Sequence, residues 1–316
     1  ALGAPVERAV LGRPVYFVDD DPERDAAAET ALRRAAASAG FREIEFQYEP
    51  IAAAFDHERS VAGDETVLVA DIGGGTSDFS LVRVGATRRN STDRRRDILA
   101  NHGVHIAGTD FDRRVELASV LPLLGFGAFG PSVDGAPPRE VPSAVYFDLA
   151  TWHLINTVYN PQRVVELGGM RAFYADPALH RRLMNVVSHR LGHDLVARAE
   201  AAKIAVAGGG AVAIELGHVE PGLQSSLDAD ELGRAVGADL ERIVAAARST
   251  LAQAGLGGDD VDALYLTGGS TGLALLNDRL QSAFPRARVV RGDRFASVAT
   301  GLALYAQRRF AQRSGR

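Results

Sequence analysis

The chain has 316 residues, of which 46% are hydrophobic and 24% charged, the composition of a folded protein with length enough for two domains. Its formal net charge of −5 and its single lysine, Lys203, argue against a nucleic-acid-binding surface. The absence of cysteine excludes a disulfide framework and a thiol nucleophile. No apolar run reaches the roughly 18 residues of a membrane helix and no secretory leader opens the chain, so we expect a cytoplasmic protein that contacts no membrane.

The first 60 residues alternate between predicted strands and helices, which is typical of an α/β fold. Pro22 suits the first turn of a helix and Gly40 suits the position just after its end. The predicted elements are a buried strand at 9–17 that Pro14 ends, a helix at 22–39, a strand at 43–48 and a helix at 51–58 after Glu49-Pro50. Residues 62–64 are predicted to form a turn and a domain boundary.

A glycine loop joins the next two predicted strands, 66–70 and 79–84, and reads Asp71-Ile-Gly-Gly-Gly-Thr-Ser-Asp78. Consecutive glycines let main-chain N–H groups approach an anion closely. The carboxylate at each end adds what phosphoryl transfer requires, one to hold hydrated Mg²⁺ and one to orient or deprotonate water. The pattern therefore favours a phosphate-binding loop over a plain hairpin.

The middle of the chain is predicted to become mostly helical. Residues 88–96 contain five arginines and are predicted to form a solvated loop before a strand at 98–106. A helix then begins near Gly108, with Thr109 or Asp110 as its N-cap. The remaining elements are an irregular Gly- and Pro-rich insertion at 121–144, a helical region at 146–210 with one long helical run over 177–207, a strand at 211–216 and a helix at 228–254 capped by Asp228. His189 and His193 would share a face of the long run, but without a third ligand we interpret them as surface residues rather than a metal site.

A second glycine turn, Thr267-Gly-Gly-Ser-Thr271, follows the apolar strand predicted at 261–266 and precedes a helix that runs to residue 284. The N-terminus of a helix favours the anionic groups of a nucleotide. The turn matches neither a Walker A motif nor a dinucleotide fingerprint, which points to another nucleotide-binding fold. A strand at 287–290 and a helix at 297–310 complete the predicted elements.

These two loops, with residues 49–54 before them and 295–301 after them, resemble the actin-like ATPase superfamily. Three segments resemble its heat shock protein 70 (DnaK-type) branch in particular: Tyr48-Glu-Pro-Ile-Ala-Ala-Ala54, Gly108-Thr-Asp-Phe-Asp112 and Ala199-Glu-Ala-Ala-Lys-Ile204. Phe46-Gln-Tyr-Glu-Pro50, Phe295-Ala-Ser-Val and Gly301-Leu-Ala-Leu304 look like the YegD-like subgroup. The resemblance extends over essentially the whole chain.

The resemblance implies an α/β fold of two ribonuclease H-like lobes with the nucleotide between them. Residues 1–63 would be the C-terminal part of the first, incomplete lobe. Residues 64–316 would be the second lobe, with a mostly helical insert at about 113–235 and a C-terminal connecting helix. The cofactors implied are ATP or ADP and Mg²⁺.

The family's functional residues carry over to named positions. Asp71 would hold Mg²⁺ through its water shell and Asp78 would orient the attacking water, while Glu49 would line the same cluster of metal and water. These three and Thr76 are the catalytic candidates. The phosphate-facing residues would be Gly73, Gly74, Gly75 and Thr76. The adenosine contacts would be Gly268, Gly269 and Ser270, with Glu200 and Lys203 reaching the ribose and base.

The sequence departs from the family in several places. Gly272 stands where an arginine usually stacks on adenine, and Ile204 and Ala207 replace a usual arginine and serine, so the family's adenine stacking and nucleotide affinity do not carry over to this sequence. The acidic residue before the second connecting helix falls on Phe295, with Asp293 the nearest carboxylate. The family's first phosphate loop and catalytic lysine are not found in these 316 residues, so we expect a fragment of a longer ATPase over a natural chain without that half-site.

The function expected from the resemblance is slow, Mg²⁺-dependent ATP hydrolysis that drives a conformational switch, provided that the full-length protein supplies the first phosphate loop. We expect no peptide holding, because no hydrophobic linker and β-sandwich follow in this sequence. Protein clients or co-chaperones would be the partners. Two alternatives stay open: a non-catalytic nucleotide-binding scaffold, which Gly272 favours, and a small-molecule kinase of the same superfamily, which the Glu200 and Lys203 helix disfavours.

Overall fold

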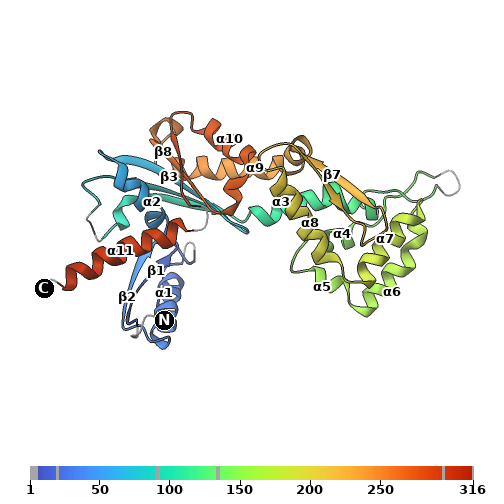
Figure 1. Ribbon diagram of the computed structural model, residues 1–316, viewed down its shortest axis with the longest axis horizontal. Coiled ribbons are helices and arrows are strands. Elements are labelled where there is room, and N and C mark those ends of the chain that lie inside the picture. Colours follow the sequence, from blue (N-terminus) through green and yellow to red (C-terminus); the bar gives the residue numbers. More distant parts are fainter. Residues whose placement is uncertain are drawn as a thin grey trace. The chain divides into compact units, whose positions relative to one another are not determined.

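The computed structural model describes residues 6–18, 21–89, 91, 93–132, 136–293 and 296–314. The chain forms two compact units, which are described separately below, and Figure 1 labels their elements. Unit 1 comprises Ala1–His105, Arg242–Thr271 and Asn277–Arg316, and unit 2 comprises Ile106–Glu241 and Gly272–Leu276. The domain boundary at residue 63 and the limits of the insert stay predictions. No helix in the described ranges combines the length and the apolar character needed to cross a membrane.

Unit 1 contains a five-stranded mixed sheet in the order β5-β4-β3-β8-β9. Its strands are β3 (Glu65–Ile72), β4 (Ser77–Val84), β5 (Ile98–Val104), β8 (Ala263–Thr267) and β9 (Arg288–Arg291). β4 pairs antiparallel with both β3 and β5, whereas β8 pairs parallel with both β3 and β9. β8 is buried throughout, as its continuous apolar sequence predicts for a strand covered on both faces. This mixed α/β arrangement is consistent with a lobe of the expected actin-like ATPase fold.

A second sheet of unit 1 pairs β1 (Arg8–Arg13) with β2 (Glu43–Tyr48) in parallel. Helix α1 (Pro22–Ser38) makes the crossover between them, with Pro22 at its start and Gly40 in the left-handed region at φ +104°, as predicted. The buried strand predicted over 9–17 was wrong in part, because β1 ends at Arg13 and its residues are only half-buried or exposed. Pro14 lacks the N–H that would continue the ladder.

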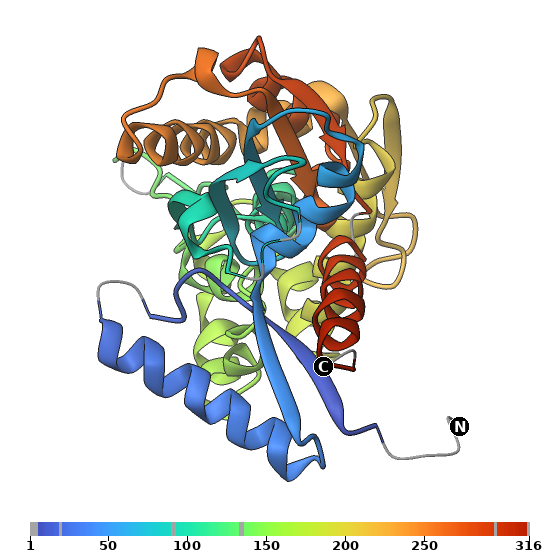
Figure 2. The same ribbon diagram turned by 90° about the vertical axis from the view of Figure 1, so that its left-hand side faces the viewer.

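Two helices of unit 1 approach each other closely at one glycine. They are α2 (Glu49–Ser60), which begins where β2 ends, and α11 (Ser297–Ser314), which runs beside β1 and β2 in Figure 2. A Cβ atom on Gly301 would lie 1.9 Å from the carbonyl oxygen of Ala52, so only glycine permits this approach. The buried face of α2, from Ile51 to Phe55, joins residues of β3, β4 and β8 in the hydrophobic core. This packing fixes the position of Glu49 at the start of α2.

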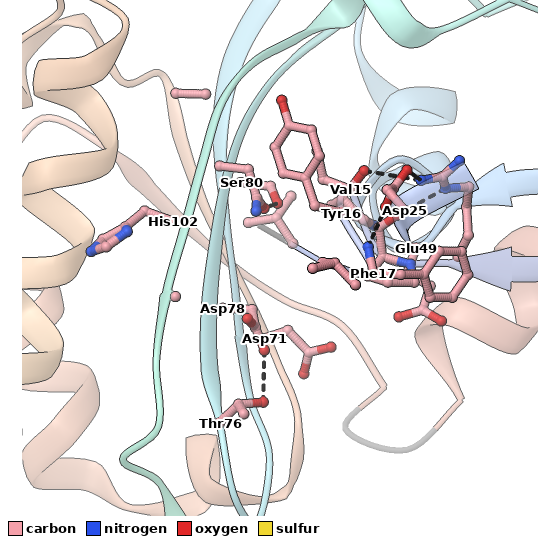
Figure 3. Close-up of a pocket in the computed structure, with 18 of the residues that line it drawn as sticks. Val15, Tyr16, Phe17, Asp25, Glu49, Asp71, Thr76, Asp78, Ser80 and His102 are labelled. Atoms are coloured by element: carbon pink, nitrogen blue, oxygen red, sulfur yellow. Dashed lines mark hydrogen bonds and ion pairs between the residues drawn. The ribbon is translucent and has the colours of Figure 1, made fainter. Parts of the chain in front are cut away.

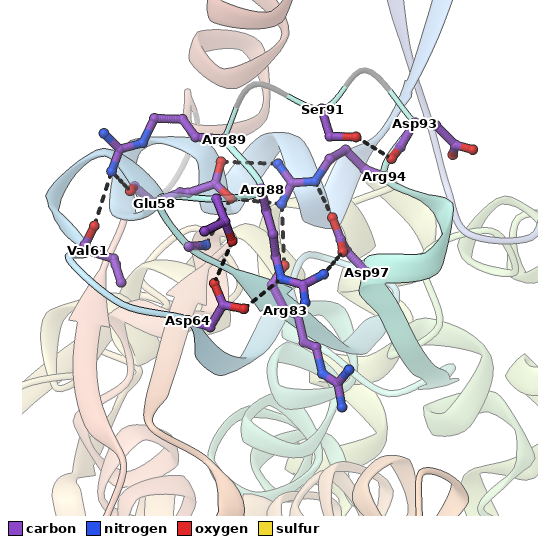
Figure 4. Close-up of polar contacts among 12 residues, drawn as sticks. Glu58, Val61, Asp64, Arg83, Arg88, Arg89, Ser91, Asp93, Arg94 and Asp97 are labelled. Carbon is purple, nitrogen blue, oxygen red and sulfur yellow. Dashed lines mark hydrogen bonds and ion pairs between the residues drawn. The ribbon is translucent and has the colours of Figure 1, made fainter.

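The loop with five arginines is not simply solvated, which corrects the sequence-based interpretation (Figure 4). Arg94 donates to both carboxylate oxygens of Glu58 on α2, at 2.8 and 3.1 Å, and both side chains are 0% exposed. Arg94 also contacts Asp97, which in turn binds Arg88. Arg89 donates to the carbonyl oxygens of Glu58 and Val61 at the end of α2. The loop therefore anchors α2 to the sheet.

Unit 2 is mostly helical, as expected, with one small antiparallel sheet. Its elements are α3 (Gly108–Val115), a π-helical turn (Glu116–Val120), a 3₁₀ turn (Leu121–Leu124), α4 (Ala144–Leu149), α5 (Ile155–Val158), α6 (Pro161–Gly169), α7 (Pro177–Ser188), α8 (Gly192–Ala205), β6 (Ala211–Glu215) and β7 (Gln224–Asp228). Helices α9 (Ala229–Gln253) and α10 (Ala274–Ala283) contribute to both units. The capping role of Asp228 is confirmed, since its Oδ1 accepts the N–H of Glu231 at 2.7 Å.

Three local predictions for unit 2 were wrong. The long helical run over 177–207 is broken between α7 and α8, where Arg190 has φ 56°, so His189 and His193 do not share one helix. The N-cap of α3 is Ala107, whose N–H donates to Asp110 at 3.0 Å, and neither Thr109 nor Asp110. The strand β7 was missed, because its polar sequence has no apolar alternation beyond Leu227.

Candidate functional site: a carboxylate-lined cavity

The β3–β4 hairpin places two aspartates side by side. Asp71 and Asp78 are direct partners in the antiparallel register, so their side chains leave the same face of the sheet. The N–H of Gly73 donates to the carbonyl of Thr76 at 3.0 Å and closes the tip. The hydroxyl of Thr76 donates to Asp78 Oδ2 at 2.7 Å, which fixes the orientation of that carboxylate (Figure 3).

The hairpin and α2 border one cavity of about 1340 Å³ within unit 1. Asp71, Thr76 and Asp78 line it from the hairpin, and Glu49 lines it from the first turn of α2 (Figure 3). β1 passes close to Glu49, since a Cβ on Gly12 would lie 2.9 Å from Glu49 Oε1. The structure thus brings the four catalytic candidates to one cavity, while their chemical roles stay predictions.

Three of the carboxylates that line the cavity, Glu49, Asp71 and Asp78, repel one another. Burial, and then the charge of Asp78, raises the pKa of Asp71. Burial, and then the charges of Asp71 and Asp78, raises the pKa of Glu49. A cation in the cavity would relieve this repulsion, and carboxylate oxygens suit Mg²⁺. Within the described part of the chain no three such side chains are close enough to ligate a metal ion directly, and the role predicted for Asp71 is contact through water.

Replacing Asp71 with asparagine is expected to stabilise the metal-free chain at neutral pH. Because its folded pKa is raised, the aspartate contributes stability that is present at low pH and lost as the pH rises through that pKa. The gain of Asp71→Asn should therefore grow from pH 4 to pH 7.5 in urea unfolding experiments. Asp259→Asn, the same change at an exposed position outside the cavity, is the control. A gain that does not grow with pH would contradict the assigned repulsion.

The second glycine loop lies against the first within unit 1. β3 and β8 run parallel, with Asp71 opposite Thr267, so the loops that follow them meet at one edge of the sheet. Ser270 donates from its hydroxyl to the carbonyl of Gly73 at 2.7 Å. Gly268 has φ +86°, and a Cβ there would lie 2.4 Å from the carbonyl oxygen of Ile72. Gly268 is therefore required by this close approach, and the adenosine contacts of Gly268, Gly269 and Ser270 stay predictions.

Glu200 and Lys203 lie on α8, in unit 2. The ammonium of Lys203 is 2.6 Å from Asp112 Oδ1 and donates to the carbonyl of Gly108 at 3.3 Å, both on α3. Lys203 therefore holds α8 to α3, whereas Glu200 is exposed. Their contacts with ribose and base stay predictions, as does the effect of Gly272, Ile204 and Ala207 on adenine binding.

The residues beside the last helix are only partly described. Phe295 lies outside the described residues. The carboxylate of Asp293 accepts the N–H of Ala296 at 2.9 Å and so caps the start of α11.

Part of the cavity wall was missed by the sequence-based reasoning. The loop after β1 contributes Tyr16, which is 54% exposed, and Arg13 forms an ion pair with Asp25 of α1 at 2.8 Å. Asp25 also accepts the N–H of Phe17. Although burial opposes it, these hydrogen bonds lower the pKa of Asp25. Arg13 lies on a strand and Asp25 on the following helix, and no motif links them in the sequence.

Comparisons with known proteins find matches to about a third of the chain. Chaperone protein DnaK of Thermosipho melanesiensis is 37% identical over 116 residues, which are 36% of this chain and 17% of that protein. Chaperone protein dnaK of Gracilaria tenuistipitata var. liui is 35% identical over 115 residues, 36% of this chain and 16% of that protein. The match thus spans about a sixth of the length of these curated relatives. Residues 1–117, which include Glu49 and the whole Asp71–Asp78 loop, match the family model "Hsp70 protein" and carry an Hsp70 family domain.

Proposed function

We propose that this chain is the ATP- and ADP-binding part of a DnaK-like protein that hydrolyses ATP slowly with Mg²⁺ and uses the bound nucleotide to set its conformation. The observation that carries the proposal is the convergence of Glu49, Asp71 and Asp78, with Thr76, on one cavity beside two glycine loops. In this proposal residues 64–316 form a ribonuclease H-like lobe and residues 1–63 are part of another. The partners would be protein clients or co-chaperones.

In this proposal Asp71, Asp78 and the glycines of the hairpin have different roles in ATP hydrolysis. Asp71 would hold hydrated Mg²⁺, which supplies charge neutralisation to the phosphates when bound. Asp78, oriented by Thr76, would accept a proton from the attacking water as its oxygen bonds to the terminal phosphorus and the bond to the ADP oxygen breaks. Gly74 and Gly75 are exposed at the tip of the hairpin, where phosphate oxygens can approach their main chain.

The test compares Asp71→Asn and Asp78→Asn in the full-length protein. Asp78→Asn is expected to lower Mg²⁺-dependent ATP turnover by about 10²–10⁴-fold, the usual contribution of a general base, while ATP still binds. In the parent protein ATP should bind more tightly in buffer with Mg²⁺ than in buffer with EDTA, and Asp71→Asn should abolish this difference. Asp259→Asn should behave as the parent protein. Unchanged turnover in both cavity variants would sink the catalytic assignment, and ATP consumption that needs an added hydroxyl compound would favour the kinase alternative.

A further inference from the structure

A second cavity of unit 1, of about 520 Å³, shares no lining residue with the carboxylate-lined cavity. It lies between the last turn of α2 and the strands β8 and β9. Its lining residues are His57, Arg59, Ser60, Tyr265, Val290 and Arg291. Residues far apart in the sequence thus bring two arginines, a histidine and two hydroxyl-bearing side chains to one pocket, which we name the arginine pocket.

The two arginines of this pocket have no acidic partner among the residues that the structure describes. Arg59 and Arg291 are both exposed, and neither guanidinium forms an ion pair there. Glu65 is the acid that His57 contacts, at 2.9 Å, and it also accepts two hydrogen bonds from Arg288 at 3.1 Å. Burial alone would raise the pKa of Glu65, but its hydrogen bonds with His57 and Arg288 lower it on balance. The partners of Glu65 are thus His57 and Arg288, and not Arg59 or Arg291. Among the described residues, the lining of the pocket therefore carries two positive charges without an ion-pair partner.

The charge of Arg59 also acts on Arg308, which lies outside the pocket lining. Burial, together with the charges of Arg89, Arg59 and Arg94, lowers the pKa of Arg308 on α11 in spite of Glu58 nearby. The position of Arg59 alone has an ordinary explanation, because a cation in the last turn of α2 is favoured by the helix dipole. That explanation does not extend to Arg291, which comes from β9.

We propose that the arginine pocket binds a phosphate group, either as free phosphate or as a phosphate monoester. A guanidinium presents paired N–H donors that match phosphate oxygens, and two such groups neutralise a dianion. The hydroxyl of Ser60 donates to the carbonyl of His57 at 2.7 Å and can rotate to donate to a phosphate oxygen instead. A volume of about 520 Å³ holds a phosphoryl group and leaves room for a small organic group attached to it.

The proposal is tested by titrating the chain with inorganic phosphate and with phenyl phosphate, at constant ionic strength, while following arginine Nε–H resonances by NMR. Saturable shifts at Arg59 and Arg291 are expected with one or both probes. Each of Arg59→Gln and Arg291→Gln should weaken binding by about 10-fold or more, as the loss of a charge-assisted hydrogen bond predicts. Tighter binding of phenyl phosphate would identify a monoester as the ligand, and tighter binding of inorganic phosphate would identify the free anion.

Two controls separate this pocket from the nucleotide cavity and from non-specific charge. Arg286→Gln removes an exposed arginine outside the pocket and should leave the phosphate affinity unchanged. Asp78→Asn alters the other cavity and should leave the shifts of Arg291 unchanged, so failure of the proposed ATPase and failure of this inference give different results. Unfolding curves establish that each variant is folded. An absence of saturable shifts, or equal affinity in the double variant Arg59→Gln, Arg291→Gln, would overturn the proposal.

Discussion

Arg94→Met is expected to lower the free energy of unfolding by about 3–5 kcal/mol, the cost of breaking a buried ion pair from one side. The Arg94 and Glu58 side chains are both 0% exposed, so the substitution leaves the Glu58 carboxylate buried with the N–H of Gly85 as a hydrogen-bond donor and without its bidentate guanidinium partner. Asp97 loses a partner as well. Chemical denaturation of the variant beside the parent chain measures the effect.

The neighbouring substitution Arg96→Met is the matched control, because Arg96 is exposed. Its expected effect lies within about 0.5 kcal/mol, as for most surface changes. The double variant Glu58→Met, Arg94→Met should recover part of the loss, since it removes both charges together. If Arg94→Met and Arg96→Met unfolded at the same denaturant concentration, the buried network would not stabilise the chain.

Glu116→Met is expected to raise the free energy of unfolding by about 1–3 kcal/mol, the usual cost of a buried polar group without a partner. Glu116 begins the π-helical turn after α3 and is 0% exposed. Neither of its carboxyl oxygens has a hydrogen-bond partner among the described residues. Methionine has a similar length and removes the polar atoms, so the gain should not be offset by a cavity.

The pH dependence gives a second readout at this position. Burial, and then the charge of Asp112, raises the pKa of Glu116 well above its ordinary value of 4.5. The folded chain therefore holds a proton that the unfolded chain has released, and stability falls as the pH rises from 4.5 through the raised pKa. The difference between Glu116→Met and the parent should thus widen with pH. Glu140→Met, at an exposed position, should show no widening, and a constant difference for Glu116→Met would contradict the assignment.

The elements marked by glycine and proline were predictable from the sequence. Pro22 and Gly40 defined α1 to within one residue, because one removes an N–H that a helix start does not use and the other adopts the left-handed conformation. The apolar run before Asp71 and the glycines after it defined the β3–β4 hairpin. These elements could be predicted because the backbone preferences of proline and glycine, rather than contacts with distant residues, determine where they begin and end.

Features set by long-range contacts were not predictable. A run of arginines predicts a solvated loop, and only the buried acid on α2 shows that Arg94 is internal. The break at Arg190 was hidden because this residue is neither glycine nor proline, yet it takes a positive φ at the end of α7, where the N–H of Leu191 donates to the carbonyl of Val186. The break separated His189 from His193.

The candidate site was predictable only in part. Asp71, Thr76 and Asp78 could be singled out from their own loop, because carboxylates beside consecutive glycines carry a chemical meaning. Glu49 is separated from them by a helix and a strand, and only the family resemblance connected it to the loop. The rim formed by Arg13 and Asp25 carried no motif, so it became visible only in the folded chain.

The register of the β3–β4 hairpin also limits how the loop can change in length. Successive side chains of a strand alternate between the two faces of the sheet, and Asp71 and Asp78 now leave the same face as direct partners. One residue inserted between Gly73 and Thr76 must either bulge the tip, or shift the register of β4 by one residue and so turn Asp78 and the buried side chains of β4 to the opposite faces. Two inserted residues preserve the parity of the strand. Natural or engineered variants of this loop should therefore tolerate even changes in length far better than odd ones.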